Sequence, residues 1–168
     1  MSLVIKGKQP NSKMCFVCGK ENGFGLKSRF YELENGELLA LFTPASEHQG
    51  YPGRLHGGIA AAILDETIGR AIMIPYASTV WGVTVDFSMK LKKPIPLDGE
   101  IRVLARVTRD RKKIFEGSGE ILLSDGTPAI TATGKYLKMA IDSITDADFV
   151  EDSWEVTEEE CDPQQITL

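Results

Sequence analysis

Hydrophobic and polar positions alternate along most of this chain and predict six strands and one helix. Two short runs, 26–33 and 37–43, flank an Asn-Gly pair, which is a strong signal for a β-hairpin. Four longer runs follow the helix, and turn-forming or charged residues separate them: 79–91, 99–108, 114–123 and 129–139. Strands joined by such short turns favour an antiparallel sheet.

The predicted helix, 57–74, is apolar on nearly every side. Only four of its eighteen residues are charged or carry a hydroxyl, while two glycines mark its start and Pro75 its end. A helix of this kind has to be enclosed, because it has no polar face to offer to water. We therefore predict an α+β fold of the hotdog type, a curved antiparallel sheet wrapped around one long central helix.

The run 79–91 shows the clearest alternation. Its hydrophobic face carries Trp81, Val83, Val85, Phe87 and Met89, together with Thr79. Thr84 lies on the opposite face, since successive side chains of a strand point to opposite sides. The pattern predicts that the first face belongs to the core and that Thr84 does not.

Two acidic residues interrupt the apolar helix. Asp65 is surrounded by Ile, Ala and Leu, and burial of an unpaired carboxylate is costly, so it has either a buried hydrogen-bond partner or a chemical role. Glu66 has an ordinary explanation, because Arg70 lies four residues later and predicts an exposed ion pair along the helix.

His56, Gly57 and Gly58 stand at the predicted helix start. The first N–H groups of a helix have no partner within it, and glycine allows another molecule to approach them closely. Gly58 therefore offers an N–H that can stabilise an oxyanion, although tight packing against a strand is the alternative. His56 is either a base or a side chain that bonds to the loop.

The spacing between Gly58 and Asp65 predicts whether both can act on the same substrate within one chain. Gly58 and Asp65 are seven residues apart and lie roughly 10 Å from each other along the helix axis. One reacting carbon atom cannot lie close to both, since reacting atoms must approach within about 3–3.5 Å. If both residues are catalytic, we expect a dimer in which Gly58 of one chain faces Asp65 of the other.

The stretch HGGIAAAILDE, followed by VTVDFSMKLKKPIPLDGEI, resembles the acyl-CoA thioesterases of the hotdog superfamily, of the phenylacetate-degradation type. The similarity covers about 15–139, and the segment CFVCGKENGFGL also resembles the start of several family members. The resemblance implies hydrolysis of acyl-CoA, with Asp65 as nucleophile or as base for water and the Gly58 N–H as oxyanion donor. Thr84 falls where relatives place a Ser or Thr that helps to position the water.

The resemblance also implies contacts to the substrate near the helix start, where Gly57 belongs to the same motif. Many relatives carry an Asn or Gln about six residues before the His, whereas this chain has Gly50 there. Gln49 or His48, beside it, is the expected substitute. The basic residues Lys90, Lys92, Lys112 and Lys113 stand at strand ends, where they form either a solvated rim or contacts to the phosphates of coenzyme A.

Composition divides the chain into three parts. Residues 1–25 read as an irregular arm that contains Cys15 and Cys18, residues 26–140 as the hotdog domain, and residues 141–168 as an acidic tail with ten acids and no Lys or Arg. A Cys-x-x-Cys pair is half a zinc site, and the third cysteine, Cys161, lies in the tail. We predict a reduced pair, with no metal and no cofactor.

Several classes of protein are excluded. The chain has no apolar run long enough for a membrane span and no secretory signal at its start, and its cysteines form no disulfide framework, so we expect a cytoplasmic protein. Its pI of about 5.1 argues against nucleic acid as a partner. The expected partners are acyl-CoA and further copies of the chain, as a homodimer or a dimer of dimers (a homotetramer).

Two rival functions remain. One is a non-catalytic acyl-CoA-binding or regulatory hotdog module, although no DNA-binding helix pair is appended. The other is a hydratase, whose chemistry usually needs an Asp/His pair, and no His follows His56 in this chain.

Overall fold

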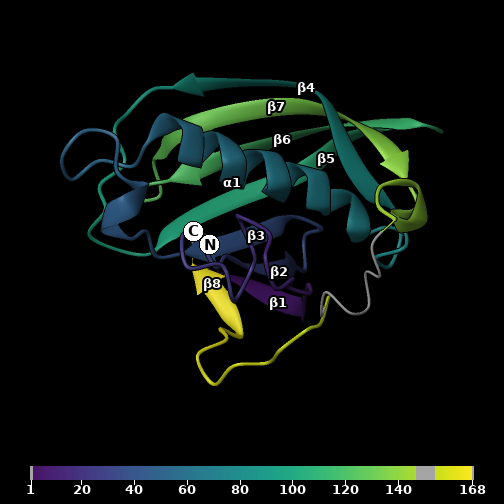
Figure 1. Ribbon diagram of the computed structural model, residues 1–168, viewed down its shortest axis with the longest axis horizontal. Helices are drawn as coiled ribbons and strands as arrows, with labels where there is room; N and C mark the ends of the chain where they lie inside the picture. The colour runs from purple at the N-terminus through teal and green to yellow at the C-terminus, as the bar shows by residue number, and fades with distance from the viewer. Residues whose placement is uncertain (1, 147–153, 168) are drawn as a thin grey trace.

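The computed structural model describes residues 2–146 and 154–167, and in this part of the chain eight strands form one antiparallel sheet. The sheet curves around a single long helix (Figure 1), which confirms the predicted hotdog fold. In order across the sheet, the strands are β4 (Trp81–Leu91), β7 (Pro128–Met139), β6 (Ile114–Leu122), β5 (Ile101–Asp110), β3 (Leu38–Phe42), β2 (Arg29–Leu33), β1 (Ser2–Lys8) and β8 (Gln165–Thr167).

The helix α1 (Gly57–Arg70) lies across the concave face of this sheet (Figure 1) and continues into a 3-10 turn, η2 (Ala71–Met73). Two further 3-10 turns are η1 (Ser46–His48) and η3 (Ile141–Ser143). Ile63, Leu64 and Ile68 of α1 are completely buried, as expected for a helix that is apolar on nearly every side. Among residues 2–146 and 154–167, no helix has the length and hydrophobicity that crossing a bilayer requires.

Hydrophobic side chains are buried on both faces of the sheet. Leu38 and Ala40 of β3 face the helix and join the main core, whereas Leu39 and Leu41 join a smaller cluster that includes Tyr31 and Ile166. All five residues of β3 are therefore buried. This explains why the run 37–43 is more continuously hydrophobic than a strand with one solvated face.

The two ends of the chain differ from the sequence expectation. Ser2–Lys8, placed in an irregular arm, forms strand β1, which pairs with β2 on one side and with β8 on the other. The acidic tail contacts β1 as well, because Lys8 Nζ lies 2.8 Å from Asp162 Oδ2. These pairings join segments that are far apart in the sequence, so local patterns do not reveal them. Phe149, a hydrophobic residue in the tail, lies outside the described residues.

Helix α1 sits directly on two glycines of β6. A Cβ atom built at Gly117 would lie 2.5 Å from Ile68 Cγ2 and 3.0 Å from the Arg106 carbonyl oxygen, and one at Gly119 would lie 3.0 Å from Ile68 Cγ1. The absence of side chains at these two positions lets the helix approach the sheet closely. This approach sets the distance between α1 and the strands that flank it.

We expect Gly117→Ala to lower the free energy of unfolding by about 1–3 kcal/mol, because overpacking at this contact forces Ile68 or the strand to move. The matched control is Gly99→Ala, where an added Cβ has nothing within 4 Å. It should change stability by less than about 0.5 kcal/mol. Urea unfolding of both variants gives the comparison, and equal stabilities would contradict the close contact.

Candidate active site

Asp65 is held by two hydroxyl groups from the sheet. It is half-buried on α1, and its Oδ1 accepts hydrogen bonds from Thr84 Oγ1 at 2.9 Å and from the Tyr136 hydroxyl at 3.1 Å. Thr84 Oγ1 also lies 3.1 Å from Oδ2, and the Tyr136 hydroxyl lies 3.2 Å from the Asp65 backbone oxygen. Both contacts offset the cost of removing the carboxylate from water, and they fix its orientation.

A β-bulge brings Thr84 to this position. In the β4–β7 register Thr84 faces Tyr136 and Asp86 faces Lys135, so Val85 has no partner. The extra residue reverses the alternation, and Thr84 points to the helix side although Phe87, three residues later, also packs against the core. The prediction that 79–91 presents one continuous core face is therefore wrong, because Val85 is 57% exposed. Thr84 is turned toward Asp65 but is exposed, in agreement with the prediction that it lies outside the core.

Tyr136 is a site residue that the sequence analysis missed. It is completely buried on β7 and stacks on Phe115, with 5.0 Å between the ring centroids. Burial and the negative charge of Asp65 raise the pKa of Tyr136 well above its ordinary value, so the hydroxyl stays protonated and acts as a donor. The sequence did contain a signal for it, because Tyr136 is a polar hydroxyl-bearing residue in the otherwise hydrophobic part of the predicted strand 129–139.

At the other end of α1, His56 caps the helix. Its Nδ1 accepts a hydrogen bond of 2.9 Å from the Gly58 N–H, the group expected to serve as oxyanion donor. In the single chain this N–H is thus occupied by His56. Both residues are exposed. Gly57 contributes no side chain and lies near Leu91, whose Cδ2 would be 3.4 Å from an added Cβ.

The loop before the helix positions His56. The backbone N–H of His56 donates to the His48 carbonyl oxygen at 2.9 Å. A Cβ atom added at Gly50 would lie 3.3 Å from the His56 ring. His48 is buried and uses both ring nitrogens, with Nδ1 2.9 Å from the Ala45 nitrogen and Nε2 2.9 Å from the Phe24 oxygen. Gln49 is exposed, and its Oε1 accepts from the Gly53 N–H at 3.2 Å. Gln49 is therefore the more accessible of the two expected substitutes for the family's Asn or Gln.

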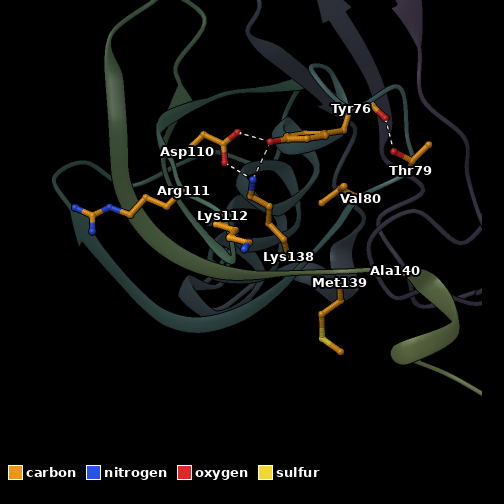
Figure 2. A pocket seen from close by; sticks show the side chains of 9 residues that line it. All are labelled: Tyr76, Thr79, Val80, Asp110, Arg111, Lys112, Lys138, Met139 and Ala140. Carbon is orange, nitrogen blue, oxygen red and sulfur yellow. Dashed lines mark hydrogen bonds and ion pairs between the residues drawn. The ribbon is translucent and has the colours of Figure 1, made fainter.

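The four lysines lie in two groups at opposite ends of the sheet. The Lys113 carbonyl oxygen accepts a hydrogen bond from the Lys138 N–H, and Lys138 lies opposite Gly82 at the start of β4. Lys90 and Lys92 lie at the other end of β4. A strand of this length separates its ends by roughly 30 Å. Lys112 lines a cavity of about 550 Å³ (Figure 2), in which the Lys138 ammonium contacts Asp110 and the Tyr76 hydroxyl. A single chain does not bring the two groups together.

A second cavity, of about 300 Å³, opens beside Asp65. Its walls come from α1, η2, the start of β4, the turn η3, the arm and the acidic tail. They include Cys15, Glu66, Arg70, Trp81, Thr84 and Trp154. The Glu66–Arg70 ion pair is confirmed at 2.9 Å, but the expectation that it is exposed is wrong because Arg70 is only 4% exposed. Its guanidinium is covered by the rings of Phe30 and Trp154, at 4.2 and 4.5 Å.

Comparisons with known proteins agree with this geometry. Residues 52–130, which include the His-Gly-Gly motif, Asp65 and Thr84, match the family model described as the thioesterase superfamily. Acyl-coenzyme A thioesterase THEM4 of Mus musculus is 27% identical over 136 residues, which cover 80% of this chain and 57% of that protein. Acyl-coenzyme A thioesterase 13 of Homo sapiens is 26% identical over 103 residues, which cover 61% of this chain and 72% of that protein.

Solved structures share the fold. A crystal structure of a thioesterase superfamily protein superposes with a TM-score of 0.67 and 24% identity, covering 73% of this chain and 59% of that one. The Escherichia coli PaaI protein from the phenylacetic acid degradation operon gives a TM-score of 0.61 at 15% identity, with 68% and 81% covered. The chain spans a little over half the length of the THEM4 relatives. Residues 52–130 are thus similar in sequence to the thioesterase superfamily, and the chain shares the hotdog fold of solved thioesterase structures.

Proposed function

We propose that the protein hydrolyses the thioester of an acyl-CoA to a free acid and coenzyme A. The observation that carries this proposal is the Asp65 carboxylate, fixed by Thr84 and Tyr136 beside a cavity, on a helix that begins with His-Gly-Gly. The names of the relatives, acyl-coenzyme A thioesterases, support the same substrate class.

Asp65 supplies the attacking group in either of two ways. As a general base, it takes a proton from water, whose oxygen attacks the thioester carbon; as a nucleophile, its own oxygen attacks. In both cases the C–S bond then breaks and coenzyme A leaves as a thiolate that takes up a proton. In the nucleophile route the acyl group is left bonded to Asp65 as an anhydride, which water then hydrolyses to release the acid. Thr84 and Tyr136 orient the carboxylate toward the substrate, and the Gly58 N–H stabilises the oxyanion once the substrate carbonyl displaces His56.

We propose a homodimer as the active unit, because Gly58 and Asp65 lie at opposite ends of the same helix. Strand β4 is one edge of the sheet and is eleven residues long, so its outer backbone groups are available for pairing with a second β4. In such a two-fold pair the Leu91 end of one strand lies beside the Trp81 end of the other. The pairing would also bring Lys90 and Lys92 of one chain toward Lys112 and Lys113 of the other, which supports a site for the phosphates of coenzyme A.

A cytoplasmic location belongs to the same proposal. It is supported by Cys15, Cys18 and Cys161, which are all free thiols, as expected in a reducing compartment.

Asp65→Asn should lower kcat for acyl-CoA hydrolysis by at least about a hundredfold while the fold is retained, because only the base or nucleophile is lost. Asp86→Asn is the matched control, since Asp86 is exposed on the same strand as Thr84. Release of free thiol from a panel of acyl-CoAs provides the assay. If wild type and Asp65→Asn release thiol at rates within about twofold, Asp65 is not catalytic. If wild type binds acyl-CoA without releasing thiol, the non-catalytic binding module is favoured.

Thr84→Val should lower kcat by roughly tenfold with little change in KM, because it removes a hydrogen bond that orients Asp65 without changing the cavity shape. Thr84→Ser keeps the hydroxyl and should retain most of the activity. Steady-state kinetics of the pair separate the hydroxyl from packing. Equal losses in both variants would contradict a positioning role.

The shared site is tested with mixed dimers. Gly58→Val removes the donor end and Asp65→Ala the acid end, so each homodimer should be inactive. A heterodimer of the two keeps one complete site and should regain about half of the wild-type activity. The two variants are co-refolded with different affinity tags, and the purified heterodimer is assayed. No recovery in a verified heterodimer would show that each chain contains a whole site.

A further inference from the structure

Two cysteines of the arm meet the C-terminal half of the helix that carries Asp65. The Sγ atoms of Cys15 and Cys18 and a carboxylate oxygen of Glu66 lie within 4.8 Å of one another. Cys15 Sγ donates to Glu66 Oε2 at 3.2 Å, and Arg70 donates to Cys18 Sγ at 3.0 Å. The mechanism proposed above uses none of these four side chains.

The chain turn between the two cysteines is tightly built. The Gly19 N–H donates to the Cys15 carbonyl oxygen at 2.7 Å, and a Cβ at Gly19 would lie 2.4 Å from that oxygen. The Ser12 hydroxyl accepts from the Cys15 N–H at 3.1 Å and lies 3.6 Å from Cys18 Sγ. Only glycine fits at position 19, and the turn holds both sulfur atoms on the same side.

Charge distinguishes the two sulfur atoms. The hydrogen bond from Cys15, together with the positive charge of Arg70, lowers the pKa of Cys18 to about 7 although burial opposes it. The bond to Cys18, burial and the negative charge of Glu66 raise the pKa of Cys15 above its ordinary range. The surroundings therefore favour the proton on Cys15 and the negative charge on Cys18.

A metal ion fits this cluster poorly. Two thiolates and a carboxylate are zinc ligands, but the Arg70 guanidinium already donates to Cys18 Sγ and to Glu66 Oε1. Arg70 also donates to the Pro10 carbonyl oxygen at 2.9 Å and is 4% exposed, so it is fixed in place. The positive charge that a zinc ion would supply is therefore already present.

We propose that Cys15 and Cys18 are a redox-active pair that forms a reversible disulfide in the wall of the Asp65 cavity, with hydrogen peroxide as the oxidant. Cys15 is half-buried and lines that cavity, so a small oxidant reaches it first. Cys18 is completely buried behind it and acts as the resolving cysteine. The inference does not depend on the proposed hydrolase activity.

The reaction has two steps. Cys15 passes its proton to the Glu66 carboxylate that it contacts and attacks one peroxide oxygen; the O–O bond breaks, and the leaving hydroxide takes a proton from solvent to become water. The Cys18 thiolate then attacks the sulfur of the Cys15 sulfenic acid; the S–O bond breaks, and the departing hydroxide takes the proton held by Glu66 to become water. The sulfur atoms lose two electrons in total, and one peroxide becomes two waters.

The test uses the full chain with Cys161→Ser, which leaves Cys15 and Cys18 as the only thiols. After brief treatment with hydrogen peroxide, intact mass should fall by about 2 Da, both thiols should resist alkylation, and dithiothreitol should restore them. Adding Cys18→Ser removes the resolving cysteine, so Cys15 should instead gain about 16 Da and react with a sulfenic-acid probe.

Three results would overturn the proposal. The first is two thiols that stay open to alkylation after peroxide treatment. The second is a disulfide that appears only between chains on a non-reducing gel. The third is one equivalent of added Zn²⁺ that remains bound through gel filtration and protects both thiols, which would identify a metal site instead. Thiol content and mass are measured without a hydrolysis assay. The result of this test therefore does not depend on whether the protein hydrolyses acyl-CoA.

Discussion

A carboxylate in an enclosed helix needs hydrogen-bond donors, and much of this structure supplies them to Asp65. Thr84 and Tyr136 come from neighbouring strands and face each other across the β4–β7 ladder. Thr84 faces Asp65 because Val85 bulges out, and α1 lies close enough to both strands because β6 carries no side chain beneath Ile68. The orientation of the Asp65 carboxylate thus depends on the bulge at Val85, on Gly117 and Gly119 of β6, and on Tyr136.

The sequence predicts the parts of the fold that local patterns encode. The hairpin between β2 and β3 follows from the Asn-Gly pair, and α1 from its apolar run that ends shortly before Pro75. Hydrophobic periodicity also locates strands β4 to β7 to within about three residues. These elements are specified by neighbours in the sequence, and they suffice to identify the hotdog architecture.

The features that sequence patterns missed depend on contacts between distant segments. The bulge at Val85 leaves no mark in composition, because Val suits a core position as well as an exposed one. Tyr136 joins the site only through the β4–β7 register. In the same way, Arg70 looks like a surface partner of Glu66 until Pro10 and Cys18 of the arm come to lie against it. Candidate residues were thus visible within the helix motif. Of their partners on the sheet, Thr84 was expected only from the family resemblance, and Tyr136 was not expected at all.

The pairing of β1 with β8 has a consequence for how the protein is made. Leu3 lies opposite Ile166, so β1 receives its outer neighbour only after all the strands between them in the sequence have been synthesised. Until then β1 has β2 on one side and an open edge on the other, and open edges attract strands of other molecules. The short β8 therefore closes this edge last, and during synthesis the nascent chain passes through a stage in which it is most prone to aggregate.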